Sequence, residues 1–153
     1  MRRVHFEVRF VLCALAALAL AGCPTNVVEQ AQDVQQKVAA GNAFQEQMGQ
    51  LRVLGAAYNR HIDATNKGPA NWQELKQTGN NDPALQALET AGCVVAWGKS
   101  FRDAPHGSSE FVVAYLPSTL ESGGAVLVLD GAVLNLTADE LKQKLAAQQQ
   151  PAP

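Results

Sequence analysis

The sequence predicts an α+β domain, in which a long N-terminal helix packs on a small antiparallel β-sheet of three or four strands and a C-terminal helix closes the fold. Two observations support this prediction. Apolar residues recur at spacings of three and four in the first half of the chain, and short β-rich runs separated by turn residues follow Gly92. The chain has 153 residues, which is enough for one modest domain.

The long helix is expected from Ala43 to about Ala64. Its apolar positions lie on one helical face that would pack on the core: Phe44, Met48, Leu51, Leu54, Tyr58 and Ile62. The run Asn66-Lys67-Gly68-Pro69 ends this helix, because proline cannot continue it.

A Gln-rich segment precedes the long helix and forms a separate spacer over residues 23–41. Its small apolar residues follow a narrow helical stripe, made of Val27, Ala31, Val34 and Val38. The stripe fits a coiled-coil-like seam, a helix lying on the domain, or a spacer off a membrane. Gly41 is expected to end this helix, and Asn42 with Gln45 resembles the capping box of the next one.

Short helices and strands are expected to fill the rest of a domain over residues 42–147. Asn71 and Asp82 are helix caps, and Pro83 suits a first helical turn. The expected strands cover 93–97, 111–116, 125–129 and 132–136, with a polar loop from Lys99 to Glu110. Thr137 and Glu140 fit a capping box for the closing helix, and residues 148–153 form a disordered tail.

Asp130 and Gly131 lie between the last two β-rich runs and predict a tight hairpin turn. A two-residue turn of type I′ needs a positive φ at both central positions, which Asp-Gly tolerates. Asp130 is therefore interpreted as a turn former and not as a metal ligand, since no second carboxylate follows at a calcium-loop spacing.

The N-terminus has the pattern of a bacterial lipoprotein signal over residues 1–22. Basic residues precede an apolar run from Phe10 to Leu20, which is too short for a bilayer core that needs roughly 20 residues. The run closes on Leu20, Ala21, Gly22 and Cys23, the expected cleavage motif. Cleavage before Cys23 would leave its thiol to carry lipid, and two or three acyl chains anchor a protein stably.

Charge and cysteine content narrow the possible partners. Without residues 1–22, which hold three arginines and one glutamate, the chain carries nine basic and thirteen acidic side chains, a formal charge of −4. This charge argues against binding to nucleic acid or to anionic lipid. Once Cys23 is lipidated, Cys93 stands alone, so no disulfide forms within one mature chain.

Two stretches resemble the soluble domain of pseudopilin-like proteins of the type II secretion and prepilin-like group. One is the run from Leu51 through Tyr58 and His61 into Lys67-Gly68-Pro69, and the other is Val126 to Val133 around Asp130-Gly131. The resemblance covers roughly residues 43–145 and implies a pseudopilin-like α+β fold in the cell envelope. Such proteins keep an N-terminal apolar helix, which a lipoprotein signal replaces here, so the resemblance does not imply a filament or a reaction.

The residues that could carry chemistry have simpler structural interpretations. His61 and Asp63 are two positions apart on a helix and therefore point to different faces. His106 lies in a polar loop. Cys93 begins an apolar strand, where a free cysteine is usually a small buried hydrophobe. We predict no catalytic residue, no metal site and no cofactor.

The sequence thus predicts an exported, non-enzymatic envelope protein, held to the membrane by lipid on Cys23 and acting as an interaction or scaffold module. Pro24 after the cysteine favours outer-membrane delivery, facing the periplasm. An envelope protein is the expected partner, and nucleic acid is not. Two alternatives remain: a small-ligand binder near the Lys99 to Ser109 loop, and a thiol- or His-dependent enzyme that pairs Cys93 with His61 or His106.

Overall fold

The computed structural model describes residues 26–104 and 106–149, and the side chains of residues 26–33, 36 and 40 are left aside. The expected signal segment, its motif Leu20 to Cys23 and residues 150–153 of the expected tail lie outside the described residues. The tail was predicted to begin at Gln148, and this is wrong, because Gln148 ends the C-terminal helix and binds the Val112 backbone through its side chain. The chain divides into two compact units, Met1–Gly41 and Asn42–Pro153.

The helix α2 spans Asn26–Thr65 and contributes to both units. The helix stop expected at Gly41 and Asn42 is wrong, because the backbone is helical through both residues. Glycine lowers helix propensity by only about 1 kcal/mol relative to alanine, which a 40-residue helix tolerates. In the first unit, Val34 and Val38 are exposed by 59% and 57%.

The second unit has the predicted α+β fold. Its elements after α2 are α3 (Trp72–Thr78), α4 (Pro83–Thr90), β1 (Val94–Val95), the 3-10 helix η2 (Phe101–Asp103), β2 (Val112–Tyr115), α5 (Thr119–Ser122), β3 (Gly124–Val128), β4 (Val133–Leu136) and α6 (Ala138–Gln148). The four strands form an antiparallel sheet in the order β1-β2-β3-β4. The sequence missed η2 and α5, which are single turns too short to show a periodic pattern.

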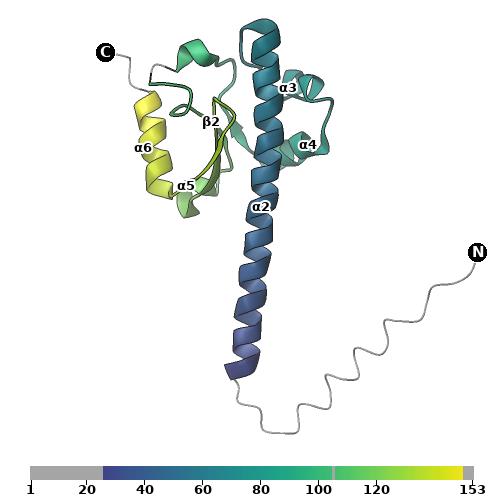
Figure 1. The fold of residues 1–153 in the computed structure, drawn as a ribbon, viewed down its shortest axis with the longest axis vertical. Helices are drawn as coiled ribbons and strands as arrows, with labels where there is room; N and C mark the ends of the chain where they lie inside the picture. Colours follow the sequence, from purple (N-terminus) through teal and green to yellow (C-terminus); the bar gives the residue numbers. More distant parts are fainter. Residues whose placement is uncertain (1–25, 105, 150–153) are drawn as a thin grey trace, which may run out of the picture. The chain divides into compact units, whose positions relative to one another are not determined.

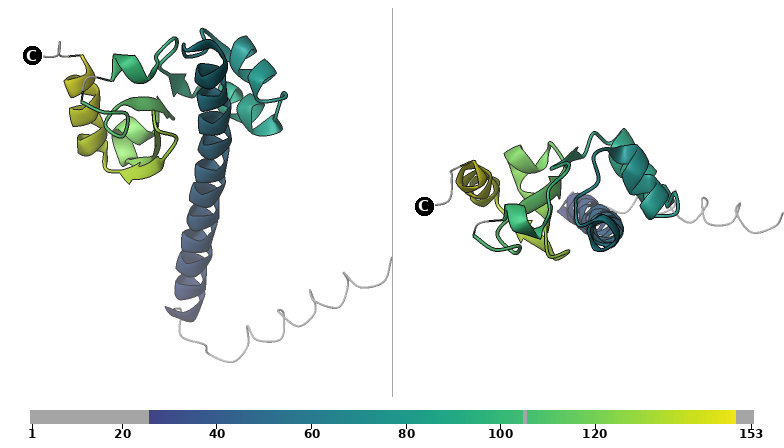
Figure 2. Two further views of the ribbon diagram at one scale, coloured as in Figure 1. Left: turned by 45° about the horizontal axis from the view of Figure 1, so that its top comes forward. Right: turned by 90° about the horizontal axis from the view of Figure 1, so that it is seen from above.

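The sheet separates two apolar clusters. Alternate residues of β3 point to opposite faces, as the two-residue repeat of a strand requires. Leu127 faces the cluster that α2 fills with Leu51, Leu54 and other residues, whereas Val126 faces Leu141 of α6. Within this unit, α6 therefore lies on one side of the sheet and the domain part of α2 lies on the other (Figures 1 and 2).

The helix caps follow the local sequence signals. The side chain of Asn71 accepts a hydrogen bond from the Glu74 N–H, and that of Asp82 accepts one from the Ala84 N–H. Thr137 and Glu140 form the expected capping box at the start of α6. The carboxylate of Glu140 accepts hydrogen bonds from Thr137, which lowers its pKa.

The hairpin between β3 and β4 lies at the expected place with a different turn. Among its residues only Gly131 has a positive φ, of 89°, so the type I′ geometry is wrong. The Gly131 N–H donates to the Val128 carbonyl at 2.9 Å, which closes a four-residue turn. The Asp130 carboxylate accepts from the Ala132 N–H at 2.9 Å, and this bond gives Asp130 a structural role in the turn.

Candidate functional site

Cys93 is buried beside the sheet, with 6% of its surface exposed. Burial raises the pKa of its thiol to about 12, since a thiolate is poorly solvated there. The Cys93 Sγ lies 3.8 Å from the Val94 carbonyl, and the backbone of Tyr115 also interacts with the thiol. Among the described residues, neither His61 nor His106 makes a hydrogen bond with Cys93, so the structure does not join the Cys–His pairs that the sequence left open.

His61 connects α2 with α3. Its Nδ1 lies 3.0 Å from the hydroxyl of Thr78, and its Nε2 lies 3.8 Å from a carboxylate oxygen of Glu74. The Thr78 hydroxyl donates its own hydrogen to the Glu74 carbonyl, and it therefore accepts from His61. Asp63 is exposed and joins no part of this group. The geometry gives His61 a structural use at the helix contact.

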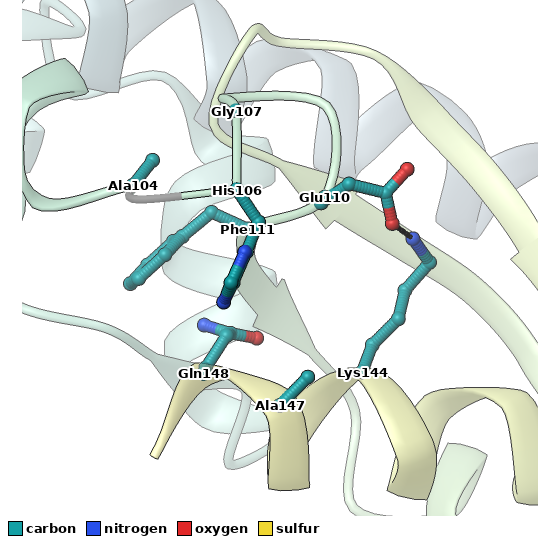
Figure 3. Close-up of a pocket in the computed structure, with 8 residues that line it drawn as sticks. All are labelled: Ala104, His106, Gly107, Glu110, Phe111, Lys144, Ala147 and Gln148. Carbon is teal, nitrogen blue, oxygen red and sulfur yellow. Dashed lines mark hydrogen bonds and ion pairs between the residues drawn. The ribbon is translucent and has the colours of Figure 1, made fainter. Parts of the chain in front are cut away.

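A pocket of about 330 Å³ lies between the chain that follows η2, the start of β2 and the last turns of α6 (Figure 3). Its lining is mostly apolar and is contributed by Ala104, His106, Gly107, Glu110, Phe111, Lys144, Ala147 and Gln148. Ala104, His106 and Gly107 belong to the polar loop near which the sequence placed a possible ligand. The pocket residues on α6 were not predicted.

The shortness of β1 explains why the pocket lies there. The last hydrogen bond along this edge of β2 joins the Ala96 N–H to the Val113 carbonyl at 2.8 Å, and the chain then leaves the sheet. The side chain of Gln148 takes the vacated place beside Val112. Its Oε1 accepts from the Val112 N–H and its Nε2 donates to the Val112 carbonyl, both at 3.1 Å.

Three further polar groups border the pocket. Lys144 Nζ forms an ion pair with Glu110 Oε2, and this pair joins α6 to the residue before Phe111. The His106 side chain is exposed and makes no hydrogen bond with the residues that the structure describes. Figure 3 shows the Glu110–Lys144 pair at one end of the pocket and Phe111 with His106 at the other.

A second hollow, of about 420 Å³, lies where α2 faces the α3–α4 connection. Asn80 and Asn81 both have a φ of 54° there. Their N–H groups donate to the carbonyls of Gln77 and Lys76, which ends α3 and leaves neither group for an anion. Arg60 also uses its guanidinium internally, donating to the Thr78 carbonyl at 3.0 Å.

The described part of the chain shows neither a metal-ligand cluster nor a membrane-spanning helix. It holds no group of three or more His, Cys, Asp or Glu side chains placed to bind a metal ion. Among the same residues, no helix is both long and apolar enough to span a bilayer.

No family model, no curated protein and no solved structure matches the chain.

Proposed function

We propose that this protein is a non-enzymatic component of the bacterial cell envelope, anchored by lipid on Cys23 and acting as an interaction or scaffold module. The observation that carries the proposal is the sequence Leu20-Ala21-Gly22-Cys23 after a short apolar run and a basic start. The mature chain would begin at Cys23, only a few residues before α2 begins at Asn26. The lipid would then hold this helix close to the membrane surface.

The helix before the domain supports the interaction part of the proposal. Val34 and Val38 are exposed on residues 26–41, although burying an apolar side chain is favourable by roughly 25 cal/mol per Å². An envelope partner that covers these side chains would gain this free energy. We propose outer-membrane residence facing the periplasm, on the basis of Pro24, and fractionation of the membranes tests it.

The pseudopilin-like character of residues 42–147 is part of the same proposal. It is supported by the order of a long helix, short helices and antiparallel strands that end in an Asp130-Gly131 hairpin. The proposal concerns the fold and the envelope setting. It does not extend to filament assembly, because a lipoprotein signal stands where such proteins have their apolar helix.

A cross-linked pull-down from the native membrane tests the partner. The wild-type chain is compared with Cys23→Ser and with a chain that lacks residues 25–40. A defined partner that is captured by the wild type and lost in both variants supports the proposal and names the complex. If the deletion captures the same partners as the wild type, the helix is not the interacting surface. If no partner is found in any sample, the scaffold role is wrong.

The thiol-dependent enzyme is a weaker alternative on physical grounds. The thiolate is the reactive form of cysteine, and a pKa of about 12 leaves almost none of it at neutral pH. The side chain is also buried and does not line the pocket. Cys93 is better explained by packing in the apolar cluster that α2 shares with the sheet.

Binding of a small ligand is the second candidate, and the pocket on the 104–111 segment favours it. A volume of about 330 Å³ is within the roughly 300–1,000 Å³ range of ligand sites, and its lining is mostly apolar, as in such sites. A ligand present at 100 times its Kd would stabilise the domain by roughly 2.7 kcal/mol. A thermal-shift screen on the wild type and on Ala147→Trp, which would fill the pocket, tests this candidate.

A further inference from the structure

The pocket beside Phe111 has an apolar surface and a polar end, and the two are separated in space. Phe111 is 7% exposed and is contributed by the segment that leads into β2, while Ala104 and Ala147 come from the opposing walls. These side chains offer no hydrogen bond to a ligand. An apolar body of a ligand therefore fits against them, although the His106 ring lies at the same end of the pocket.

The polar side chains at the pocket differ in how many hydrogen bonds they can still offer to a ligand. Gln148 uses both ends of its amide on Val112, so it offers a ligand little. Lys144 Nζ has three hydrogens and directs one of them to Glu110. The His106 ring makes no hydrogen bond with any residue that the structure describes. Two groups, Lys144 and His106, are thus open to a ligand as hydrogen-bond donors.

The side chains of Lys144 and Glu110 differ in exposure, and this difference favours a negatively charged ligand over a positively charged one. The Lys144 side chain is 21% exposed, whereas that of Glu110 is 58% exposed. The Lys144 side chain is therefore the more buried member of the pair, and its partner carboxylate is carried by a side chain that lies largely in solvent. Glu110 faces solvent and can turn away, which leaves Lys144 facing the incoming group.

We propose that this pocket binds a small amphiphilic anion, whose apolar body lies against Phe111, Ala104 and Ala147 and whose carboxylate, sulfonate or phosphate pairs with Lys144 (Figure 3). His106 lies at the Phe111 end of the pocket, away from Lys144, and offers a second polar contact there. The volume of about 330 Å³ limits the body to a small ring system or a short branched chain. This inference rests on the ligand-binding function proposed above as the second candidate, and it specifies the chemical class of the ligand.

Two matched fluorescent probes test the sign of charge. The first is 8-anilinonaphthalene-1-sulfonate, and the second is N-phenyl-1-naphthylamine, which has the same rings without the sulfonate. Both are titrated into the full mature chain carrying Cys23→Ser, which needs no detergent. Binding of the anion at one site is expected, with a Kd raised about tenfold in Lys144→Gln, the factor that 1.4 kcal/mol represents. The Kd of the neutral probe is expected to stay within about twofold.

Three further variants locate the binding. Lys142→Gln removes an exposed lysine from the same helix outside the pocket, and it should leave both probes unchanged. Glu110→Gln removes the internal competitor and should tighten binding of the anion. Ala147 is exposed, so Ala147→Trp fills the pocket without disturbing the core and should abolish binding of both probes. Far-ultraviolet circular dichroism and Tm confirm that each variant is folded.

The outcomes separate the two levels of the proposal. If both probes bind and Ala147→Trp abolishes them, but Lys144→Gln changes both equally or neither, the anion is the wrong class while the pocket stands. If binding survives Ala147→Trp, or neither probe binds the wild type, the pocket is not a ligand site and both the inference and the ligand-binding candidate are wrong.

Discussion

Gln148 is bound to Val112 by two hydrogen bonds that reproduce the pairing of a neighbouring strand. Its amide accepts from the Val112 N–H and donates to the Val112 carbonyl, each at 3.1 Å. Val112 is only 2% exposed, so without this side chain two backbone groups would lose their partner. A residue at the end of α6 thus completes the edge of the sheet where β1 is too short to do so.

Replacing Gln148 by alanine is therefore expected to destabilise the domain by about 1 to 2 kcal/mol, because two hydrogen bonds are lost at a buried backbone position. Urea unfolding measures the change. Gln149→Ala is the matched control, since Gln149 is exposed and its side chain makes no hydrogen bond with the described residues. Equal midpoints for the two variants would show that the Gln148 contact does not stabilise the fold.

Tyr58→Phe is expected to cost about 1 to 2 kcal/mol. The Tyr58 hydroxyl lies 2.7 Å from the Ala96 carbonyl and 2.9 Å from that of Lys99, and it links this segment to α2. Tyr115→Phe is the control, because the Tyr115 hydroxyl makes no hydrogen bond with the residues described, and it should change stability by less than about 0.5 kcal/mol. A Tyr58→Phe variant as stable as this control would contradict the expectation.

The domain is expected to lose stability at alkaline pH because of Tyr58. Burial raises its pKa to about 12 from the value of 10.0 that applies to the unfolded chain. The hydroxyl is protonated in both states below pH 10, so its stabilisation is complete there and is lost as the pH rises toward 12. Unfolding free energies measured at pH 8 and pH 11 should fall more for the wild type than for Tyr58→Phe. Equal losses would contradict the assignment.

Gly68→Ala is expected to be strongly destabilising, by more than about 2 kcal/mol. A Cβ at this buried glycine would meet the Lys99 carbonyl, would lie 2.8 Å from the Lys99 nitrogen and would crowd the Tyr58 hydroxyl at 2.5 Å. Gly49→Ala is the contrasting variant, since a Cβ there meets nothing within 4 Å and the helix should gain about 1 kcal/mol. Thermal unfolding of both variants distinguishes a steric effect from helix propensity. Changes in Tm of the same sign for the two variants would contradict the prediction.

Cys93 is expected to react with a maleimide at neutral pH only when the domain unfolds. Its burial and its raised pKa of about 12 both suppress the thiolate. Peptide mass spectrometry follows the labelling of the Cys93 peptide with and without urea. Rapid labelling of the folded protein at pH 7 would contradict this expectation and would favour the thiol-dependent alternative.

The features that were correctly predicted depend on neighbouring residues. Asn71, Asp82 and Thr137 cap helices because each side chain reaches an N–H two or three residues later, whatever the rest of the fold does. The apolar face of α2 likewise fixes which side of that helix is buried. The α+β class follows from these local signals.

The features that were missed depend on residues distant in the sequence. Gln148 and Val112 are 36 positions apart, and nothing in either neighbourhood specifies their contact. The pocket exists because β1 ends early, and a strand of two residues has no periodic signal of its own. The helix stop expected at Gly41 was wrong because a local signal was given too much weight. A single glycine followed by an asparagine does not end a long helix.

The most direct test of the account is the chemistry of Cys23 in the membrane-bound protein. The chain is expressed in bacteria fed an alkyne-tagged palmitate, purified from membranes and analysed by labelling and intact mass. We predict a chain that begins at Cys23 and carries the label, with Cys23→Ser unlabelled and Cys13→Ser and Cys93→Ser labelled like the wild type. An unlabelled wild-type chain, or a label that persists in Cys23→Ser, would contradict the lipid anchor.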